Sequence, residues 1–178
     1  LVAPRIAEQE YDLDHHGEHF YIRTNDKGRN FRLVKAPVAS PGRESWVEVL
    51  PHRPDVMLEG TDFFRDFSVV YERENGLPEL RVTDLRTNEW HRIAFPEPTY
   101  SAFPGQNPEF DTKLFRYNYQ SLVTPSSVYD YDTEKRTSAL LKQQEVPGGY
   151  DPALYISERV VATAKDGVKV PISLVYKK

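Results

Sequence analysis

The sequence predicts an all-β protein that contains about three four-stranded antiparallel blades of a β-propeller, followed by a β-hairpin. Short segments with alternating apolar side chains recur along the chain in groups of four. Equivalent segments return after about 50 residues, a spacing typical of propeller blades. The 11 Tyr and 9 Phe residues, against a single Met, also favour strands, because aromatic side chains suit a pleated, half-buried surface.

The first expected blade occupies the N-terminal part of the chain. Its four segments are Glu10–His15, His19–Thr24, Asn30–Lys35 and Trp46–Leu50. The runs that separate them include Asn25-Asp26-Lys27-Gly28 and Ser40-Pro41-Gly42. Gly, Pro, Asn and Asp favour turns because they allow a positive φ, fix φ in advance, or hydrogen-bond to the nearby backbone. We therefore expect short connections between antiparallel strands.

Two further groups repeat this pattern. Their segments are Val56–Phe63, Phe67–Arg73, Glu79–Asp84 and Trp90–Phe95, then Pro98–Phe103, Leu114–Gln120, Val128–Asp132 and Ser138–Lys142. Phe20, Phe67 and Phe115 each start the second strand of a group. One blade cannot bury both of its faces alone, so stacking of neighbouring blades is expected to complete the core. Twelve short strands could also build a self-contained β-sandwich, and it is the internal repeat that favours the propeller.

A change of pattern near the C-terminal end suggests three parts. They are a partial propeller over residues 1–145, an interdomain linker over 146–154, and a hairpin over 155–178. The linker is rich in Pro and Gly, and Asp151 with Pro152 predicts a helix of about one or two turns as far as Ser157. An isolated hairpin is marginally stable in water, so we expect this one to begin a second domain that continues beyond Lys178.

The hairpin itself has the strongest local signal in the chain. Its expected strands are Val160–Ala164 and Val168–Tyr176, and Asp166-Gly167 lies between them. Asp-Gly between two β-rich runs is typical of a tight hairpin turn. The pattern therefore predicts antiparallel pairing at this point.

Composition and charge exclude several classes of protein. The net charge of −4 and the absence of a basic stripe argue against nucleic-acid binding. No apolar run approaches the roughly 18 residues that a membrane-spanning helix needs, so no membrane partner is expected. The chain has no Cys, which excludes disulfides, thiolate nucleophiles and Cys-based zinc sites within it. This composition is compatible with a reducing compartment, and we expect a cytoplasmic location.

Two polar clusters are candidates for chemistry. His15-His16-Gly17-Glu18-His19 is rich in potential metal ligands, but alternation along a strand sends His15 and His16 to opposite faces, and Gly17 indicates a turn. Ser126-Ser127 follows Pro125, where hydroxyl groups usually cap turns, and the chain contains no G-x-S-x-G nucleophile elbow. We therefore expect no catalytic residue, cofactor or metal ligand in this chain.

Charged and tyrosine side chains alternate along the expected strands. The charged group is Glu72, Arg73, Glu74, Arg81, Asp84 and Arg86, and the tyrosines are Tyr117, Tyr119, Tyr129 and Tyr131. Solvated strand faces and cross-strand pairs are the expected role of the charged group, although some carboxylates could line a propeller channel and attract cationic peptides. Packing between blades is expected for the tyrosines, with a ligand surface as the less favoured alternative.

Three specific motifs lie in and after the linker: Tyr150-Asp151-Pro152-x-x-Tyr155, Glu158-Arg159 and Asp166-Gly167-Val168-x-Val170-Pro171. They resemble the prolyl oligopeptidase family, and within it the oligopeptidase B (protease II) group. Upstream, His19–Asn25 and Ser126–Tyr131 are similar to later blades of the same group. The resemblance covers essentially the whole chain.

This resemblance implies a seven-bladed propeller that covers an α/β-hydrolase domain with a Ser-His-Asp triad. It further implies a serine peptidase that cleaves short basic peptides after Lys or Arg, with the triad beyond Lys178. The expected partners of this chain are then the remaining blades, the catalytic domain and short basic peptides. A stand-alone β-repeat module that binds a peptide or protein is the alternative.

The linker is the place where the chain would pass between the two domains. The residues expected to act as a hinge are Gly148, Gly149, Tyr150, Asp151 and Pro152. The flexibility of glycine lies here beside the rigidity of proline. An ordinary connecting loop is the equally weighted alternative.

Overall fold

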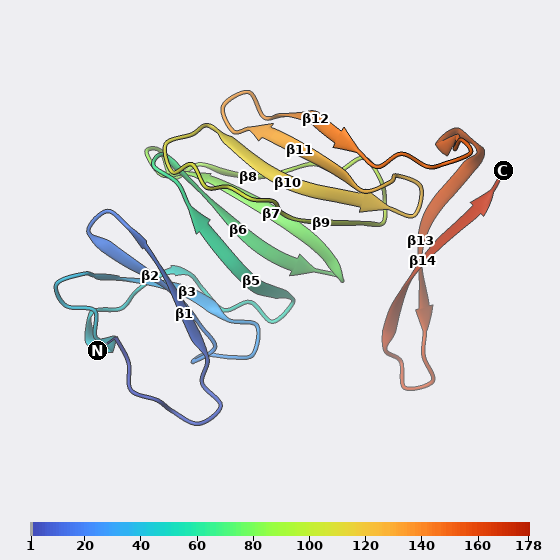
Figure 1. Cartoon of the computed structure of the whole chain (residues 1–178). Helices are drawn as coiled ribbons and strands as arrows, with labels where there is room; N and C mark the ends of the chain where they lie inside the picture. The colour runs from blue at the N-terminus through green and yellow to red at the C-terminus, as the bar shows by residue number, and fades with distance from the viewer. Residues whose placement is uncertain (1) are drawn as a thin grey trace.

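The computed structural model describes residues 2–178, and in this range the chain folds into fourteen strands and two short 3₁₀ turns. The strands form three four-stranded antiparallel sheets and one two-stranded ribbon (Figure 1). The expected all-β architecture of four-stranded blades is therefore confirmed. Within residues 2–178, no helix has the length and apolar character needed to cross a membrane.

In all three sheets, each strand pairs with the strand that follows it in the chain. The first sheet contains β1 (Tyr11–His16), β2 (His19–Thr24), β3 (Arg32–Pro37) and β4 (Val47–Leu50), with the 3₁₀ turn η1 (Arg43–Ser45) before β4. The second contains β5 (Val56–Phe63), β6 (Phe67–Glu74), β7 (Leu77–Asp84) and β8 (Trp90–Arg92). The third contains β9 (Tyr100–Pro104), β10 (Leu114–Ser121), β11 (Ser127–Asp132) and β12 (Thr137–Gln143).

One boundary differs from expectation because of the backbone at Phe31. Phe31 has a φ of 60°, a left-handed conformation that cannot continue a strand, so β3 begins at Arg32 and not at Asn30. The aromatic ring of Phe31 lies 3.6 Å from the Arg23 guanidinium carbon and is buried between the first and second sheets. This packing explains why a bulky residue occupies a strained position.

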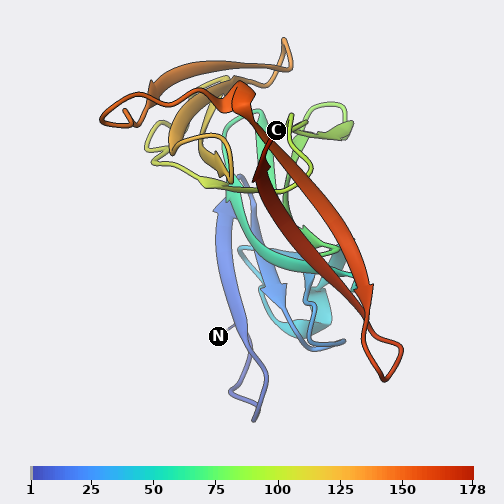
Figure 2. The same cartoon turned by 90° about the vertical axis from the view of Figure 1, so that its right-hand side faces the viewer.

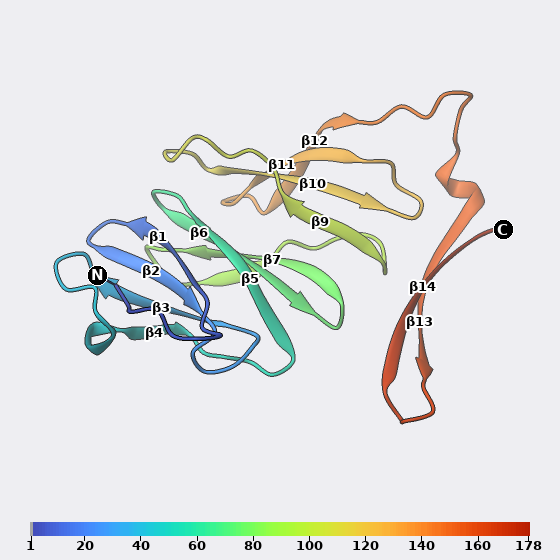
Figure 3. The same ribbon diagram turned by 60° about the horizontal axis from the view of Figure 1, so that its bottom comes forward.

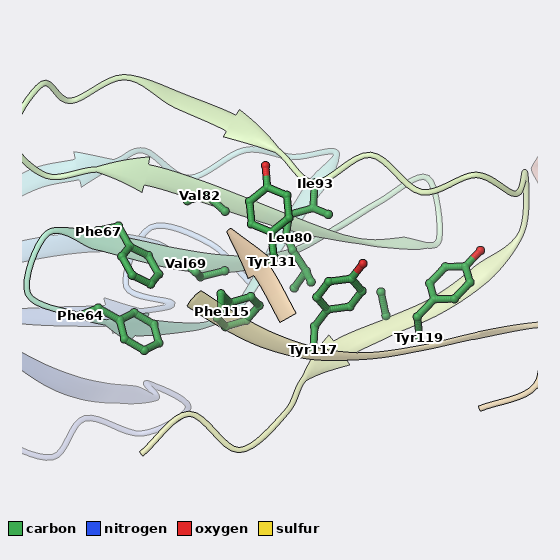
Figure 4. Close-up of a cluster of buried hydrophobic side chains, with 11 residues drawn as sticks. Phe64, Phe67, Val69, Leu80, Val82, Ile93, Phe115, Tyr117, Tyr119 and Tyr131 are labelled. Carbon is green, nitrogen blue, oxygen red and sulfur yellow. The ribbon is translucent and has the colours of Figure 1, made fainter. Parts of the chain in front are cut away.

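The largest hydrophobic core lies between the second and third sheets (Figure 4). Phe67, Val69 and Leu80 approach it from the second sheet, and Phe115 and Tyr117 from the third. A smaller cluster between the first and second sheets contains Phe31, Leu33, Leu58 and Val70. β6 is thus covered on both faces, which explains its nearly continuous run of buried residues.

The two-stranded ribbon consists of β13 (Tyr155–Thr163) and β14 (Lys169–Lys177), and it lies beyond the ends of the other strands (Figures 1 and 2). β13 begins at Tyr155, so the expected helix is reduced to the 3₁₀ turn η2 (Pro152–Leu154). The reason is that the residues from Tyr155 onward pair with the end of β14. Such pairing satisfies the backbone groups that a second helical turn would otherwise have to satisfy.

Candidate functional site at the junction between the sheets and the ribbon

The junction between the sheets and the ribbon is built from connections at one end of the strands. They are the β6–β7 turn, the segment before β9, the β10–β11 turn, and the chain from β12 to β13. Figure 3 shows this last segment leaving the third sheet and reaching the ribbon. We take this region as the candidate site because it joins the repeated sheets to the one element that departs from the repeat.

The connecting segment combines unpacked glycines with one anchored tyrosine. Gly148 and Gly149 have φ values of 88° and 89°, and a side chain at either position would meet no atom within 4 Å. Tyr150 donates a hydrogen bond from its hydroxyl to the Val123 carbonyl over 2.7 Å, and its ring stacks on Tyr155 at 5.6 Å. Packing therefore does not restrict the backbone just before the point at which Tyr150 holds it against the third sheet, and the Gly149 amide closes a turn by donating to the Val146 carbonyl over 3.1 Å.

The turn that follows is stabilised locally. Asp151 accepts a hydrogen bond from the Ala153 amide over 2.9 Å, and Pro152 occupies the start of η2. Both features suit a helix N-terminus, since the carboxylate satisfies a free amide and proline needs no donor there. The local signal that predicted a helix is thus real, although it extends for a single turn.

The ribbon contacts the sheets directly at two places. The Thr99 and Ser173 hydroxyl oxygens lie 2.6 Å apart and share a hydrogen bond, and Thr99 is only 7% exposed. At the β6–β7 turn, a Cβ added to Gly76 would lie 3.4 Å from Arg159 Nη2 and 3.8 Å from Pro171 Cγ. Gly76 also has a φ of 80°, so glycine satisfies both the turn and the close approach of the ribbon.

Partly buried carboxylates fix the connections around these contacts. Glu97 accepts hydrogen bonds from Ser121 Oγ (2.9 Å), Thr124 Oγ1 (2.6 Å) and the Tyr119 hydroxyl, which ties the segment before β9 to the β10–β11 turn. Burial raises the pKa of Glu79, and burial together with the charge of Glu79 raises the pKa of Tyr100 to about 12. Tyr100 is therefore a neutral hydrogen-bond donor at physiological pH.

The histidine cluster lies far from this junction, at the β1–β2 turn. The His15 ring lies 5.6 Å from the Phe20 ring in a tilted arrangement, whereas His16 contacts Phe63 and Phe110, each at 5.9 Å. The two rings have separate neighbours, as alternation along the strand predicts. Within residues 2–178, no group of three or more His, Asp or Glu side chains is arranged to hold a metal ion.

The serine and tyrosine candidates take part in packing. Ser127 is buried, and its hydroxyl donates to the Pro125 carbonyl over 2.6 Å. The four tyrosines belong to the core between the second and third sheets or pack against it, and the Tyr117 and Tyr129 rings stack at 5.3 Å. The expected packing between sheets is therefore confirmed for Tyr117, Tyr119, Tyr129 and Tyr131.

The expectation of a solvated charged face is wrong for Glu72. This side chain is only 1% exposed, because its face of β6 packs toward the first sheet. Its carboxylate is bonded to Arg53, from the chain between the first and second sheets, and to Arg92 Nη2 at 2.8 Å. Arg81 is a more distant neighbour, with Nη1 3.9 Å from Glu72 Oε1. Arg73 and Arg86, by contrast, form the expected exposed pairs with carboxylates.

Comparison with known proteins identifies the repeated sheets. Residues 1–144 match the family model described as "Prolyl oligopeptidase, N-terminal beta-propeller domain". The chain is 43% identical over 180 residues to "Dipeptidyl aminopeptidase BI" of Pseudoxanthomonas mexicana, covering all of this chain and 25% of that protein. It is 30% identical over 166 residues to "Protease 2" of Moraxella lacunata, covering 93% of this chain and 24% of that protein.

Solved structures agree with these relatives. Oligopeptidase B from Leishmania major superposes with a TM-score of 0.87 at 32% identity, covering 99% of this chain and 26% of that one. Oligopeptidase B from Trypanosoma brucei, solved with covalently bound antipain in a closed form, gives 0.88 at 31% identity, with the same coverage. The chain thus spans about a quarter of the length of the proteins it matches. The four-stranded sheets are propeller blades, and the chain belongs to the prolyl oligopeptidase family of serine peptidases.

Proposed function

We propose that this chain is the non-catalytic propeller portion of a serine oligopeptidase, and that it controls the access of short peptides to a hydrolase active site. The observation that carries the proposal is the direct seating of the β13–β14 ribbon on the connections of the second and third sheets. A preference for cleavage after Lys or Arg is supported by the likeness to oligopeptidase B over 99% of this chain.

The proposed organisation follows the chain. Residues 1–145 form propeller blades, residues 146–154 cross between domains, and residues 155–178 are the first hairpin of the hydrolase domain. The unpacked glycines beside an anchored Tyr150 support a hinge at residues 148–152. Short basic peptides, the remaining blades and the catalytic domain are the proposed partners. The proposed setting is cytoplasmic, with which the absence of Cys is compatible.

Access control can be tested by locking the ribbon to the sheets. The two hydroxyl oxygens of Thr99 and Ser173 lie 2.6 Å apart, so cysteines at these positions are close enough to form a disulfide. The chain contains no other Cys, which makes the bridge selective within it. In the whole protein carrying Thr99→Cys and Ser173→Cys, we expect oxidation to lower the turnover of a chromogenic Arg peptide at least about tenfold, and reduction to restore it.

The same assay tests the proposed specificity. The reduced enzyme should cleave an Arg peptide at least about tenfold faster than the matching Pro peptide. Thr99→Cys alone, treated with the same oxidant, controls for damage to the enzyme. Complete crosslinking by mass spectrometry with unchanged turnover would show that the ribbon does not have to leave the sheets for catalysis.

The hinge makes a separate prediction. Alanine at both Gly148 and Gly149 disfavours their positive φ values without creating a clash, because the surrounding space is open. We expect kcat and KM to change together by about threefold or more, as is typical of hinge substitutions. Gly167→Ala is the matched control, since Gly167 has a φ of 86° and equally open space but lies in the β13–β14 turn. If Gly167→Ala changes kcat and KM as much as the double substitution does, backbone strain alone explains the change and a hinge at Gly148 and Gly149 does not.

A further inference from the structure

A cavity of about 210 Å³ lies between the first and second sheets, away from the junction with the ribbon. Its apolar wall includes Leu33 and Leu50 from the first sheet and Phe63 and Val70 from the second. An apolar cavity of about 150 Å³ is large enough to hold benzene. The space here therefore suits a compact apolar body the size of one ring with a small polar group attached.

The charges around this cavity have one sign. Lys35 and Arg81 line it, and no Asp or Glu is among its lining residues. This is unusual in a chain whose net charge is −4. Among the described residues, Lys35 forms no ion pair within 4.0 Å, and the carboxylate nearest to Arg81 belongs to Glu72, 3.9 Å away. A cationic lining without an anion favours an anionic ligand.

Within residues 2–178, the positive charge of Arg81 is balanced only by a long ion pair, with Glu72 Oε1 3.9 Å away. Glu72 is shared with two other arginines, since its carboxylate is hydrogen-bonded to Arg53 and to Arg92 at 2.8 Å. Arg81 Nε is buried and has no hydrogen-bond partner in the described part of the chain. Burial lowers the pKa of Arg81, and the charges of Arg53 and Arg92 lower it further against the opposing pull of Glu72. An anion beside Arg81 would relieve this imbalance.

The guanidinium of Arg81 is also held in position. Its central carbon lies 4.1 Å from the centre of the Trp90 ring, which is the geometry of a cation–π contact. Stacking uses the face of the guanidinium and leaves the in-plane N–H groups of its two terminal nitrogens available, whereas Nε is buried. These groups form a fork that matches a carboxylate.

We propose that this cavity binds a small carboxylate that carries a compact apolar body. The carboxylate pairs with Arg81 and Lys35, and the apolar body fills the space between Leu33, Leu50, Phe63 and Val70. Two sources have this chemistry, namely a free acid such as phenylacetate and the C-terminal residue of a peptide that ends in Phe. The site is independent of peptidase activity.

A second cavity provides the contrast. It measures about 310 Å³ and lies between the second and third sheets. Its lining carries charges of both signs, and two opposite pairs meet there, Asp84 with Arg86 at 2.7 Å and Glu134 with Lys113 at 2.8 Å. Because charges of both signs neutralise each other there, that cavity has no comparable demand for an anion.

Calorimetric titration and thermal melting of the whole protein test the proposal with phenylacetate as the probe. We expect saturable binding and a rise in Tm, and about tenfold weaker binding of the neutral isostere phenylacetamide. Arg81→Met should weaken phenylacetate binding about tenfold or more, and Lys35→Met should weaken it less. Arg86→Met is the matched control from the second cavity and should leave the affinity unchanged.

The melting temperature of ligand-free Arg81→Met separates loss of the site from loss of the fold. We expect it to equal or exceed that of the parent, because the substitution removes a largely buried charge whose ion pair with Glu72 is long, at 3.9 Å. A peptide ending in Phe, compared with its C-terminal amide, shows whether peptides as well as free acids use the site. Equal binding of phenylacetate and phenylacetamide, or undiminished binding by a folded Arg81→Met protein, would overturn the proposal.

Discussion

Glu72→Gln is expected to lower the free energy of unfolding by about 3 kcal/mol, because it leaves partly buried guanidinium charges without their shared carboxylate. Glu72 is the fully buried residue that Arg53 and Arg92 both contact, and Arg81 lies just beyond them. Glutamine keeps the shape and some hydrogen bonding but loses the charge. Arg92 retains a second partner in Glu74 at 2.5 Å, whereas no second carboxylate lies within 4.0 Å of Arg53 in the described residues.

Urea unfolding followed by tryptophan fluorescence measures this effect, since Trp90 stacks on Arg81 within the network. Glu59→Gln is the matched control, because Glu59 lies on the adjacent strand β5 and pairs at the surface with Arg73. We expect less than about 1 kcal/mol from the control. Adding Arg81→Met to Glu72→Gln should recover part of the loss. If Glu72→Gln lowers the free energy of unfolding no more than Glu59→Gln does, the buried carboxylate does not hold the arginines together.

Phe115→Ala is expected to cost about 3–5 kcal/mol, the range for removal of a large aromatic ring from a closed core. Phe115 is 0% exposed and lies in the cluster that joins the second sheet to the third. Its ring meets Phe64 edge-on at 6.2 Å and lies 6.4 Å from Tyr71. These contacts come from β5–β6 and β10, so the ring holds two blades together, as Figure 4 shows for Phe64 and Phe115.

Leu114→Ala provides the control for Phe115→Ala, because Leu114 is the preceding residue of β10 and is 44% exposed. We expect it to cost less than about 1 kcal/mol. Hydrogen exchange should show faster exchange of β6 and β10 amides together in Phe115→Ala, since both strands border the cavity. Protection that is lost in β10 alone would mean that Phe115 stabilises its own sheet and not the contact between blades.

Most of the strand order could be predicted from sequence because the signals are local. Alternation of side chains reports which face of a strand is buried, and turn residues such as Asn75-Gly76 show where it reverses. The failures came from non-local effects. Pairing with the end of β14 converts Tyr155 into a strand residue, although Asp151 and Pro152 signal a helix just before it.

The charged network could not be predicted in the same way. Glu72 and Arg73 look alike in an alternating sequence, yet one is buried and the other exposed. Glu72 lies on the face of β6 that packs toward the first sheet, whereas Arg73 lies on the opposite face near the end of the strand, beyond the core shared with the third sheet. Arg53, which forms an ion pair with Glu72, lies in the connection between the first and second sheets. No local sequence pattern links that connection to Glu72. The glycines and prolines of the linker, in contrast, can be interpreted from sequence alone. The flexibility of glycine and the rigidity of proline are properties of the residues themselves.

The pairing of each strand with its immediate successor has a consequence for the order of assembly. Within every sheet, hydrogen bonds join strands that are neighbours in the sequence. These hydrogen bonds can therefore form as soon as the strands of that sheet have left the ribosome. The Thr99–Ser173 contact joins positions 74 residues apart in the chain and needs the third sheet already in place. We therefore expect the blades to form one after another during synthesis, with docking of the ribbon as a late step.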